Sequence, residues 1–351
     1  MKDLKNKLTT SGKGSTNIQS RRAKSFGYQV LGFGSGGAGA SYIVATGGSP
    51  CSGAIVCTDY KQHTFTGPGT FCVSNAGSVG GSNTVDYMVV AGGGGGGGAV
   101  PGGGSRGGGG GGAGGYRESS GTASGCYTAS PLGACVSALP VSVQGYPITV
   151  GGGGAGAPSG ASLATKGSNS IFSTITSTGG GYAVSNDGYG VVGASDGGPG
   201  GSGGGLGSTG GSTRTAGAGN TPPVSPQPQG NPSGGPRPNG DYAYGTSGGG
   251  AGGAGKPGTP GNYSACIAGG GAGVATSITG SPVTRAEGGW AGDWGYTPSG
   301  YPNSPSPKSG SANTGDGGGG SDTGPLPQPG WPGGTGGTGG SGVVIIRYKF
   351  Q

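Results

Sequence analysis

Few residues in this chain could perform acid–base or nucleophilic chemistry. The only histidine, His63, falls in the stretch His63-Thr64-Phe65-Thr66, whose β-branched and aromatic residues predict a strand. A Ser-His-Asp triad would have to use this histidine, and no nucleophile elbow accompanies it. The 11 acidic residues are scattered, so no spacing indicates the paired carboxylates of a glycosidase. We therefore predict that the protein is not an enzyme and binds no cofactor.

The cysteines do not have the spacing of a metal site. There are six of them: Cys51, Cys57, Cys72, Cys126, Cys135 and Cys266. None forms a Cys-x-x-Cys pair, so no metal site is expected. Two pairs, Cys51 with Cys57 and Cys126 with Cys135, close short loops and could form disulfides in an oxidising medium, with free thiols as the alternative.

The positive charge is concentrated at the N-terminus. The net charge is +7, and residues 1–24 hold +6 of it, which leaves a nearly neutral body. A neutral body does not offer the basic face of a nucleic-acid-binding domain, and only one Arg-Gly-Gly segment, 106–108, occurs. We expect no nucleic-acid partner, and an RNA-binding glycine-rich protein is only a remote alternative. The basic tail is either a docking arm or simply solvated.

Aromatic residues gather in the less glycine-rich parts of the second half. They are Tyr242, Tyr244, Trp290, Trp294, Tyr296, Tyr301 and Trp331. Tyrosine and tryptophan are typical hot-spot residues of binding surfaces, and flat rings suit stacking on sugars. These side chains are therefore candidates for contact with a host surface. The alternative is that they cover the edges of the glycine-rich body.

Composition excludes one conventional core. Glycine supplies 101 of 351 residues and the hydrophobic set only 29%, well below the globular average. No apolar run approaches 18 residues, so no membrane insertion is expected. Strand patterns occur at 63–66, 70–73, 84–90, 138–143, 146–150, 170–176 and 274–279, and in the closing run 342–350. We expect the closing strand to pair with the early strands around Phe71 and Val89.

The fold class that follows is all-β and irregular, with a small β-sandwich framing a long glycine-rich insertion. Four regions are expected: an N-terminal arm and attachment segment (1–45), a strand frame (46–91), a glycine-rich body (92–341) and a closing strand (342–351). The uninterrupted glycine run 92–98 excludes collagen, which needs glycine at every third place. Two alternatives remain for the body: a flexible coil, or polyglycine-II-type helices whose bare backbones bond sideways.

Several motifs in order resemble the glycine-rich domains of bacteriophage tail-fibre and virion proteins, many of them from cyanophages. The motifs lie at 63–71, 85–91, 114–117, 146–151, 167–172 and 342–348, and the resemblance covers about residues 58–350. The stretch 26–34 is similar to N-terminal attachment segments of cyanophage structural proteins. The candidate attachment residues are Arg21, Arg22, Tyr28, Leu31 and Phe33.

The resemblance implies a virion structural protein, a tail or neck fibre or adhesin that docks by its N-terminus and presents loops to the host. Its expected partners are other virion proteins of the neck, tail or baseplate, a host-surface glycan or outer-membrane protein, and further copies of itself, as in a trimer. The main alternative is a purely architectural fibre or decoration protein without a receptor.

Overall fold

The fold is known from a computed structural model. The structure describes residues 40–99, 107–125, 127–160, 162–185, 196–208, 214–235, 245–258, 269–292, 308–321 and 334–351. This part of the chain forms three antiparallel sheets, and its only helix is the single 3₁₀ turn η1 (Pro131–Gly133). The prediction of an all-β chain is confirmed.

The first sheet has five strands in the order β1-β4-β8-β9-β10. Their bounds are β1 (Ile43–Thr46), β4 (Gly69–Ala76), β8 (Gly145–Thr149), β9 (Ser170–Phe172) and β10 (Ile175–Ser177). In β4, Phe71 and Val73 are buried whereas Cys72 and Ser74 between them are exposed. This alternation is typical of a strand with one covered face.

The second sheet contains the closing strand at its centre. Its order is β2-β3-β13-β5-β6, with β7 also paired to β5. The bounds are β2 (Ser49–Val56), β3 (Tyr60–Phe65), β5 (Thr84–Val90), β6 (Tyr116–Glu118), β7 (Leu139–Pro140) and β13 (Val343–Lys349). Pairing of the closing strand with the strand of Val89 is confirmed, since Val344 lies opposite Val89. The predicted pairing with the strand of Phe71 is wrong, because β13 pairs on its other side with β3, whereas β4 belongs to the first sheet. Phe71 and Tyr348 meet through their rings.

One run expected to form a single strand forms two strands. The run 170–176 forms the hairpin β9–β10, in which Phe172 lies opposite Ile175 and Ser173 has a positive φ of 54°. A run of β-branched and aromatic residues does not reveal such a tight turn, because no glycine or proline marks it. The third sheet is the hairpin of β11 (Val274–Thr276) and β12 (Val283–Arg285).

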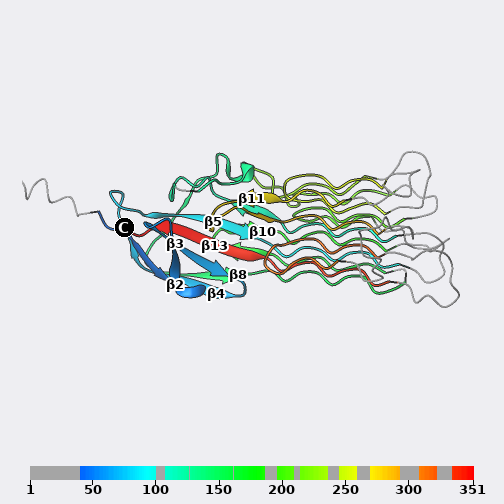
Figure 1. The fold of residues 1–351 in the computed structure, drawn as a ribbon, viewed down its shortest axis with the longest axis horizontal. Coiled ribbons are helices and arrows are strands. Elements are labelled where there is room, and N and C mark those ends of the chain that lie inside the picture. Colours follow the sequence, from blue (N-terminus) through cyan, green and yellow to red (C-terminus); the bar gives the residue numbers. More distant parts are fainter. Residues whose placement is uncertain are drawn as a thin grey trace, which may run out of the picture.

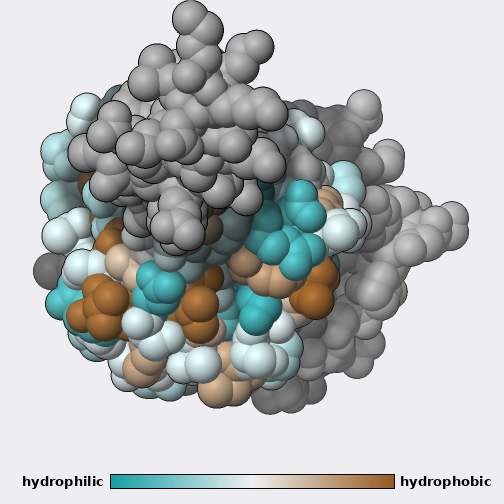
Figure 2. Space-filling view, turned by 90° about the vertical axis from the view of Figure 1, so that its left-hand side faces the viewer, coloured by the Kyte–Doolittle hydropathy of each residue, from teal (hydrophilic) through white to brown (hydrophobic). Residues whose placement is uncertain are grey.

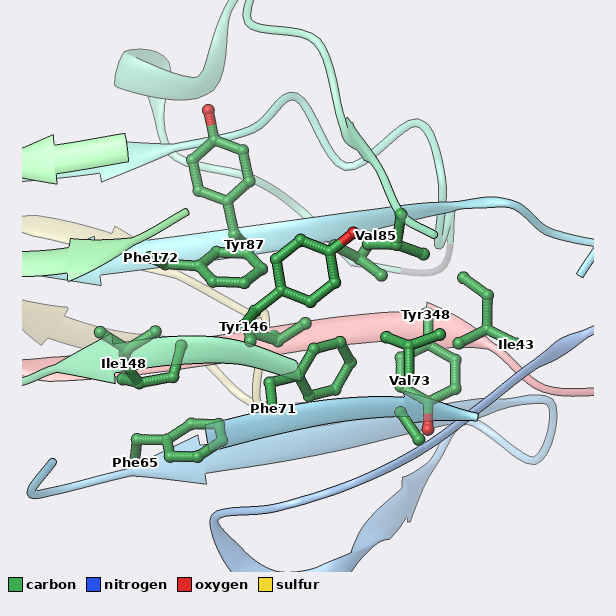
Figure 3. Packing of buried hydrophobic residues seen from close by; sticks show 14 of the residues in the cluster. Ile43, Phe65, Phe71, Val73, Val85, Tyr87, Tyr146, Ile148, Phe172 and Tyr348 are labelled. Carbon is green, nitrogen blue, oxygen red and sulfur yellow. The ribbon is translucent and has the colours of Figure 1, made fainter. Parts of the chain in front are cut away.

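The main hydrophobic cluster takes side chains from both larger sheets. Phe71 lies at its centre, near Phe172 and Tyr348 (Figure 3). Its ring centroid is 6.2 Å from that of Phe172, 6.1 Å from that of Tyr348 and 5.3 Å from that of His63. The central strands β5 and β13 are buried on both faces, because alternate residues such as Met88 enter a second cluster on the other side. Burial on both faces explains why these two strands are almost continuously apolar.

The molecule is elongated, with the sheets at one end and glycine-rich segments running side by side along the long axis (Figure 1). We call these segments the glycine bundle. They are 91–99, 107–115, 151–160, 162–169, 177–185, 196–208, 214–219, 230–235, 245–258, 269–273, 286–292, 308–321 and 334–342. Within the described residues, no helix has the length and apolarity needed to cross a bilayer.

Candidate functional site: the glycine bundle and its two ends

The segment 91–99 is buried at every residue and bonds to its neighbours through its backbone. The partner changes from one residue to the next and returns every third residue. The N–H groups of Gly93 and Gly96 both donate to segment 334–342, at Gly340 and Gly337 respectively, over 2.9 Å. The other backbone groups of segment 91–99 follow the same three-residue period with other neighbouring segments. Six neighbouring segments contribute: 109–112, 154–160, 165–168, 180–183, 318–321 and 334–340.

The segment 107–115 repeats this arrangement. Its N–H groups donate to three neighbours and its carbonyls accept from three others. The six neighbours are 94–97, 178–184, 202–205, 246–249, 289–292 and 315–321. Buried backbone groups are almost always hydrogen-bonded in folded proteins, usually within helices or sheets. In these two segments the bonds come from lateral contacts alone, although neither is a strand or a helix.

Glycine is required in these segments because the backbones lie too close for a side chain. A Cβ atom at Gly94 would lie 2.1 Å from the carbonyl oxygen of Gly181, and one at Gly95 would lie 2.0 Å from that of Ala155. At Gly96 the corresponding oxygen is that of Gly319, also at 2.0 Å. Three consecutive glycines thus face three different neighbours, so no position in the run can accept another residue without moving a backbone.

Outer segments of the bundle carry side chains at intervals of three. In 334–342, Gly334, Gly337 and Gly340 are buried, whereas Thr335 and Thr338 are exposed. The sequence of this stretch is a repeat of glycine, glycine and threonine. This short repeat is a signal in the sequence from which the three-residue period could have been found, and the composition-based reasoning missed it.

The chain enters the described structure at the sheet end. The carbonyl of Ser41 accepts from the N–H groups of Ser78 (2.9 Å) and Ser82 (3.2 Å), and the Ser82 hydroxyl donates to Lys349 O at 2.6 Å. Residue 41 therefore lies beside the C-terminal strand. Apolar side chains on the described surface of this end are scattered among hydrophilic ones (Figure 2). The predicted attachment residues Arg21, Arg22, Tyr28, Leu31 and Phe33 lie outside the described residues.

At the opposite end, the ends of several segments lie together. Ala99 N–H donates to Gly334 O at 2.8 Å, Gly98 N–H to the Ser185 hydroxyl at 2.9 Å, and Gly108 N–H to Ser321 O at 3.0 Å. These residues stand next to stretches of chain that the structure does not describe, such as 100–106, 186–195 and 322–333. The described residues that border these stretches therefore lie at the end remote from the sheets.

One predicted contact residue is described. Trp290 lies in segment 286–292 and is 44% exposed. The other six fall outside the described residues: Tyr242, Tyr244, Trp294, Tyr296, Tyr301 and Trp331. They belong to the stretches 236–244, 293–307 and 322–333, and the neighbouring residue Gly292 donates to Gly108 O at 2.8 Å, close to Ser321.

Buried polar side chains join the sheets to the base of the bundle, and the sequence reasoning missed them. The Glu118 carboxylate accepts hydrogen bonds from the Tyr116 hydroxyl (2.9 Å), from Ser130 N–H (2.9 Å) and from the Thr276 hydroxyl (2.5 Å). Burial, and then the Glu118 charge, raises the pKa of Tyr116 well above its ordinary value, so its hydroxyl remains a donor. Glu118 thus connects β6, the loop before η1, and β11.

Asp86 and Arg347 lie opposite each other on β5 and β13 and are fully buried. The hydroxyls of Ser119 and Ser124 donate to Asp86 at 2.7 and 2.5 Å. Arg347 donates to Ile278 O at 2.9 Å and contacts the rings of two tyrosines. A charged residue inside an apolar strand run was the signal for this network, because a buried charge is costly unless it is bonded.

His63 lies in β3, as the sequence predicts, and is fully buried. Its Nδ1 is 2.7 Å from Gly47 O and its Nε2 is 3.1 Å from the Tyr348 hydroxyl. A carbonyl only accepts, so Nδ1 carries the proton and Tyr348 donates to Nε2. Burial lowers the pKa of His63, and burial raises that of Tyr348 to about 12. The ring is thus held neutral within the core.

The described cysteines show no disulfide bond to one another. Cys51, Cys57, Cys72 and Cys135 are all exposed, and Arg347 Nη2 lies 3.5 Å from Cys57 Sγ. No group of three histidine, cysteine or carboxylate side chains in the described part of the chain is arranged to hold a metal ion.

Comparison with known proteins agrees with the glycine-rich character. A family model described as a glycine-rich domain matches residues 68–349. The match begins just before β4 and ends with β13, so it takes in most of both larger sheets and the whole glycine bundle. No curated protein matches the chain. Because the family model covers most of its length, the chain belongs to the glycine-rich domain family.

Proposed function

We propose that the glycine bundle consists of polyglycine-II-type helices and that the two larger sheets form a β-sandwich at its base. A polyglycine-II-type helix has three residues per turn and no internal hydrogen bonds, so its backbone groups are available to neighbours. The three-residue period of the partners of 91–99, and its six neighbours, support this arrangement. The shared hydrophobic cluster of the two sheets supports the sandwich.

On this body we propose the function of a virion appendage, a tail or neck fibre of a bacteriophage. The N-terminal arm would dock on a neck, tail or baseplate protein, and the aromatic loops would contact a glycan or protein of the host surface. The observation that carries this proposal is the separation of the two ends. Ser41 enters at the sheets, whereas the stretches with six of the seven predicted contact residues are attached at the opposite end.

A rigid bundle would serve this function without any covalent chemistry. Lateral backbone bonds hold the ends of many segments in one place, so several loops can meet the same surface at once. Weak contacts multiplied by the number of copies on a particle then give firm attachment through a high effective concentration.

The test is deletion of residues 293–307 in assembled phage particles. This deletion spares segments 286–292 and 308–321, so the bundle can still form. We expect normal particle yield and loss of adsorption to host cells. Replacement of Trp294, Tyr296 and Tyr301 by serine should weaken adsorption in the same way. A control replaces Val79, an exposed residue of the β4–β5 loop at the sheet end, by serine.

Two outcomes would contradict the proposal. Misassembled particles would indicate an architectural fibre or decoration protein without a receptor. Unchanged adsorption by complete particles would show that these aromatic residues do not bind the host surface. Binding of the purified chain to single-stranded RNA, weakening steeply with salt, would instead indicate the RNA-binding alternative.

A further inference from the structure

The outer side of segment 151–160 leaves a row of backbone groups without partners. Among the described residues, the N–H groups of Gly152, Gly153 and Gly156 and the carbonyls of Gly153 and Gly156 make no hydrogen bond. The inner side of the same segment is fully engaged: Gly154 N–H donates to Gly93 O at 2.8 Å. The free groups of Gly153 and Gly156 recur at the three-residue period of the bundle.

The glycine at position 152 has no explanation within one chain. Nothing lies within 4 Å of the place where its Cβ would be, and its φ is outside the left-handed region. At comparable exposed positions of segment 334–342 the chain has Thr335 and Thr338. Glycine costs more ordering entropy than any other residue, so it is expected where something demands it. At the buried glycines 92–98 and 108–112 that demand is a second backbone lying close.

We propose that this row binds a second copy of the chain, backbone against backbone. The occupant is a glycine-rich segment of the other copy, bonded to Gly152, Gly153 and Gly156 as 334–342 is bonded to 91–99. This inference depends on the proposed polyglycine-type packing. Charge does not oppose it, because residues outside the basic N-terminal arm are almost neutral in sum. Two bundles joined in this way present their loops together.

The test uses Gly152→Thr, which adds a branched side chain in open space and so spares the fold of one chain. The matched control is Gly80→Thr, at an exposed glycine of the β4–β5 loop that also has nothing within 4 Å. Sedimentation velocity of the full chain from about 1 to 100 μM measures association, and thermal unfolding followed by circular dichroism checks the fold. We expect the parent chain and Gly80→Thr to associate, and Gly152→Thr to be shifted at least tenfold toward monomer with unchanged unfolding.

A parent chain that stays monomeric over this range overturns the inference, as does association that Gly152→Thr leaves intact. Equal loss in both variants also overturns it, since the effect would then not belong to this row. Amide hydrogen exchange separates these failures from failure of the proposed bundle. A monomeric chain whose inner glycine amides remain protected would contradict self-association alone.

Discussion

The charged residues of the core show how single side chains connect the parts of this molecule. Glu118, Asp86 and Arg347 are buried in strands of the second sheet. Each of these side chains makes hydrogen bonds to residues outside its own strand. Glu118 has donors from three separate parts of the chain. These residues orient the loop at η1 and the β11–β12 hairpin against the second sheet.

Replacing Glu118 by alanine should therefore destabilise the fold strongly. The change leaves the Ser130 N–H, the Tyr116 hydroxyl and the Thr276 hydroxyl buried without their acceptor. We expect a loss of about 3 kcal/mol in the free energy of unfolding, measured by denaturant titration. The exposed Glu287 is the control, and Glu287→Ala should change stability by less than about 0.5 kcal/mol. Equal effects of the two changes would contradict the role given to Glu118.

His63 should make stability depend on pH. Its pKa is lowered in the folded state by burial, so the unfolded chain binds the proton more tightly. The contribution to stability is complete above about pH 6.5, the unfolded value, and is lost as pH falls below it, by at most about 1.4 kcal/mol per pH unit. The variant His63→Gln should lack this part of the slope between pH 7.5 and 5.5 in denaturant titrations. An identical slope in parent and variant would show that other groups cause it.

The glycine-rich segments have no regular hydrogen-bond pattern within themselves. Their backbone groups bond to neighbouring segments instead. An α-helix satisfies its backbone within itself and a strand with two neighbours at most. Segment 91–99 has six neighbours, and its backbone groups bond to the same neighbour at every third residue. Since the contacts are between backbones, order in this region comes from the absence of side chains.

Adding a single methyl group to a closely packed glycine of the bundle should lower the stability of the fold. Gly95→Ala places a Cβ 2.0 Å from Ala155 O, whereas Gly253→Ala places one no closer than 3.6 Å to Ala272. We expect Gly95→Ala to lower the free energy of unfolding by about 1–3 kcal/mol or more, because backbones must separate. Gly253→Ala should be neutral within about 0.5 kcal/mol. Similar melting curves for the two variants at low protein concentration would disprove close backbone packing.

For the whole molecule, the bundle behaves as one body only if its lateral bonds are cooperative. Each glycine loses more conformational freedom on folding than any other residue, so the bundle must be extensive to be stable. Its anchorage on the sheets through β5, β6 and β13 supplies the hydrophobic contribution that the glycines lack.

Amide hydrogen exchange of the full chain tests this directly. The amides of 93–97 and 108–113 should exchange far more slowly than those of a random coil, although these residues are in neither helix nor strand. Their protection should approach that of β5 and β13, because the same global unfolding would expose them. Exchange at coil rates in the bundle, with β5 and β13 protected, would show that the glycine-rich body is disordered.

Local sequence was enough to predict most of the strands. The runs at 84–90, 146–150 and 342–350 carry β-branched and aromatic residues between turn residues, and all three are strands in the structure. The sequence also identified the glycine-rich region as something other than collagen. It did not reveal β6 or β12, each of three residues, because so short a strand has no pattern of its own.

Only the tertiary structure decided which strands are neighbours and where the buried charges find partners. The closing strand pairs with β3 and β5 rather than with β4, and Glu118 meets Thr276 across 158 positions of the chain. The glycine composition already implies that backbones could approach one another, since nothing else in these residues can pack. Which carbonyl faces which glycine depends on the simultaneous position of many segments, and no single segment encodes that position.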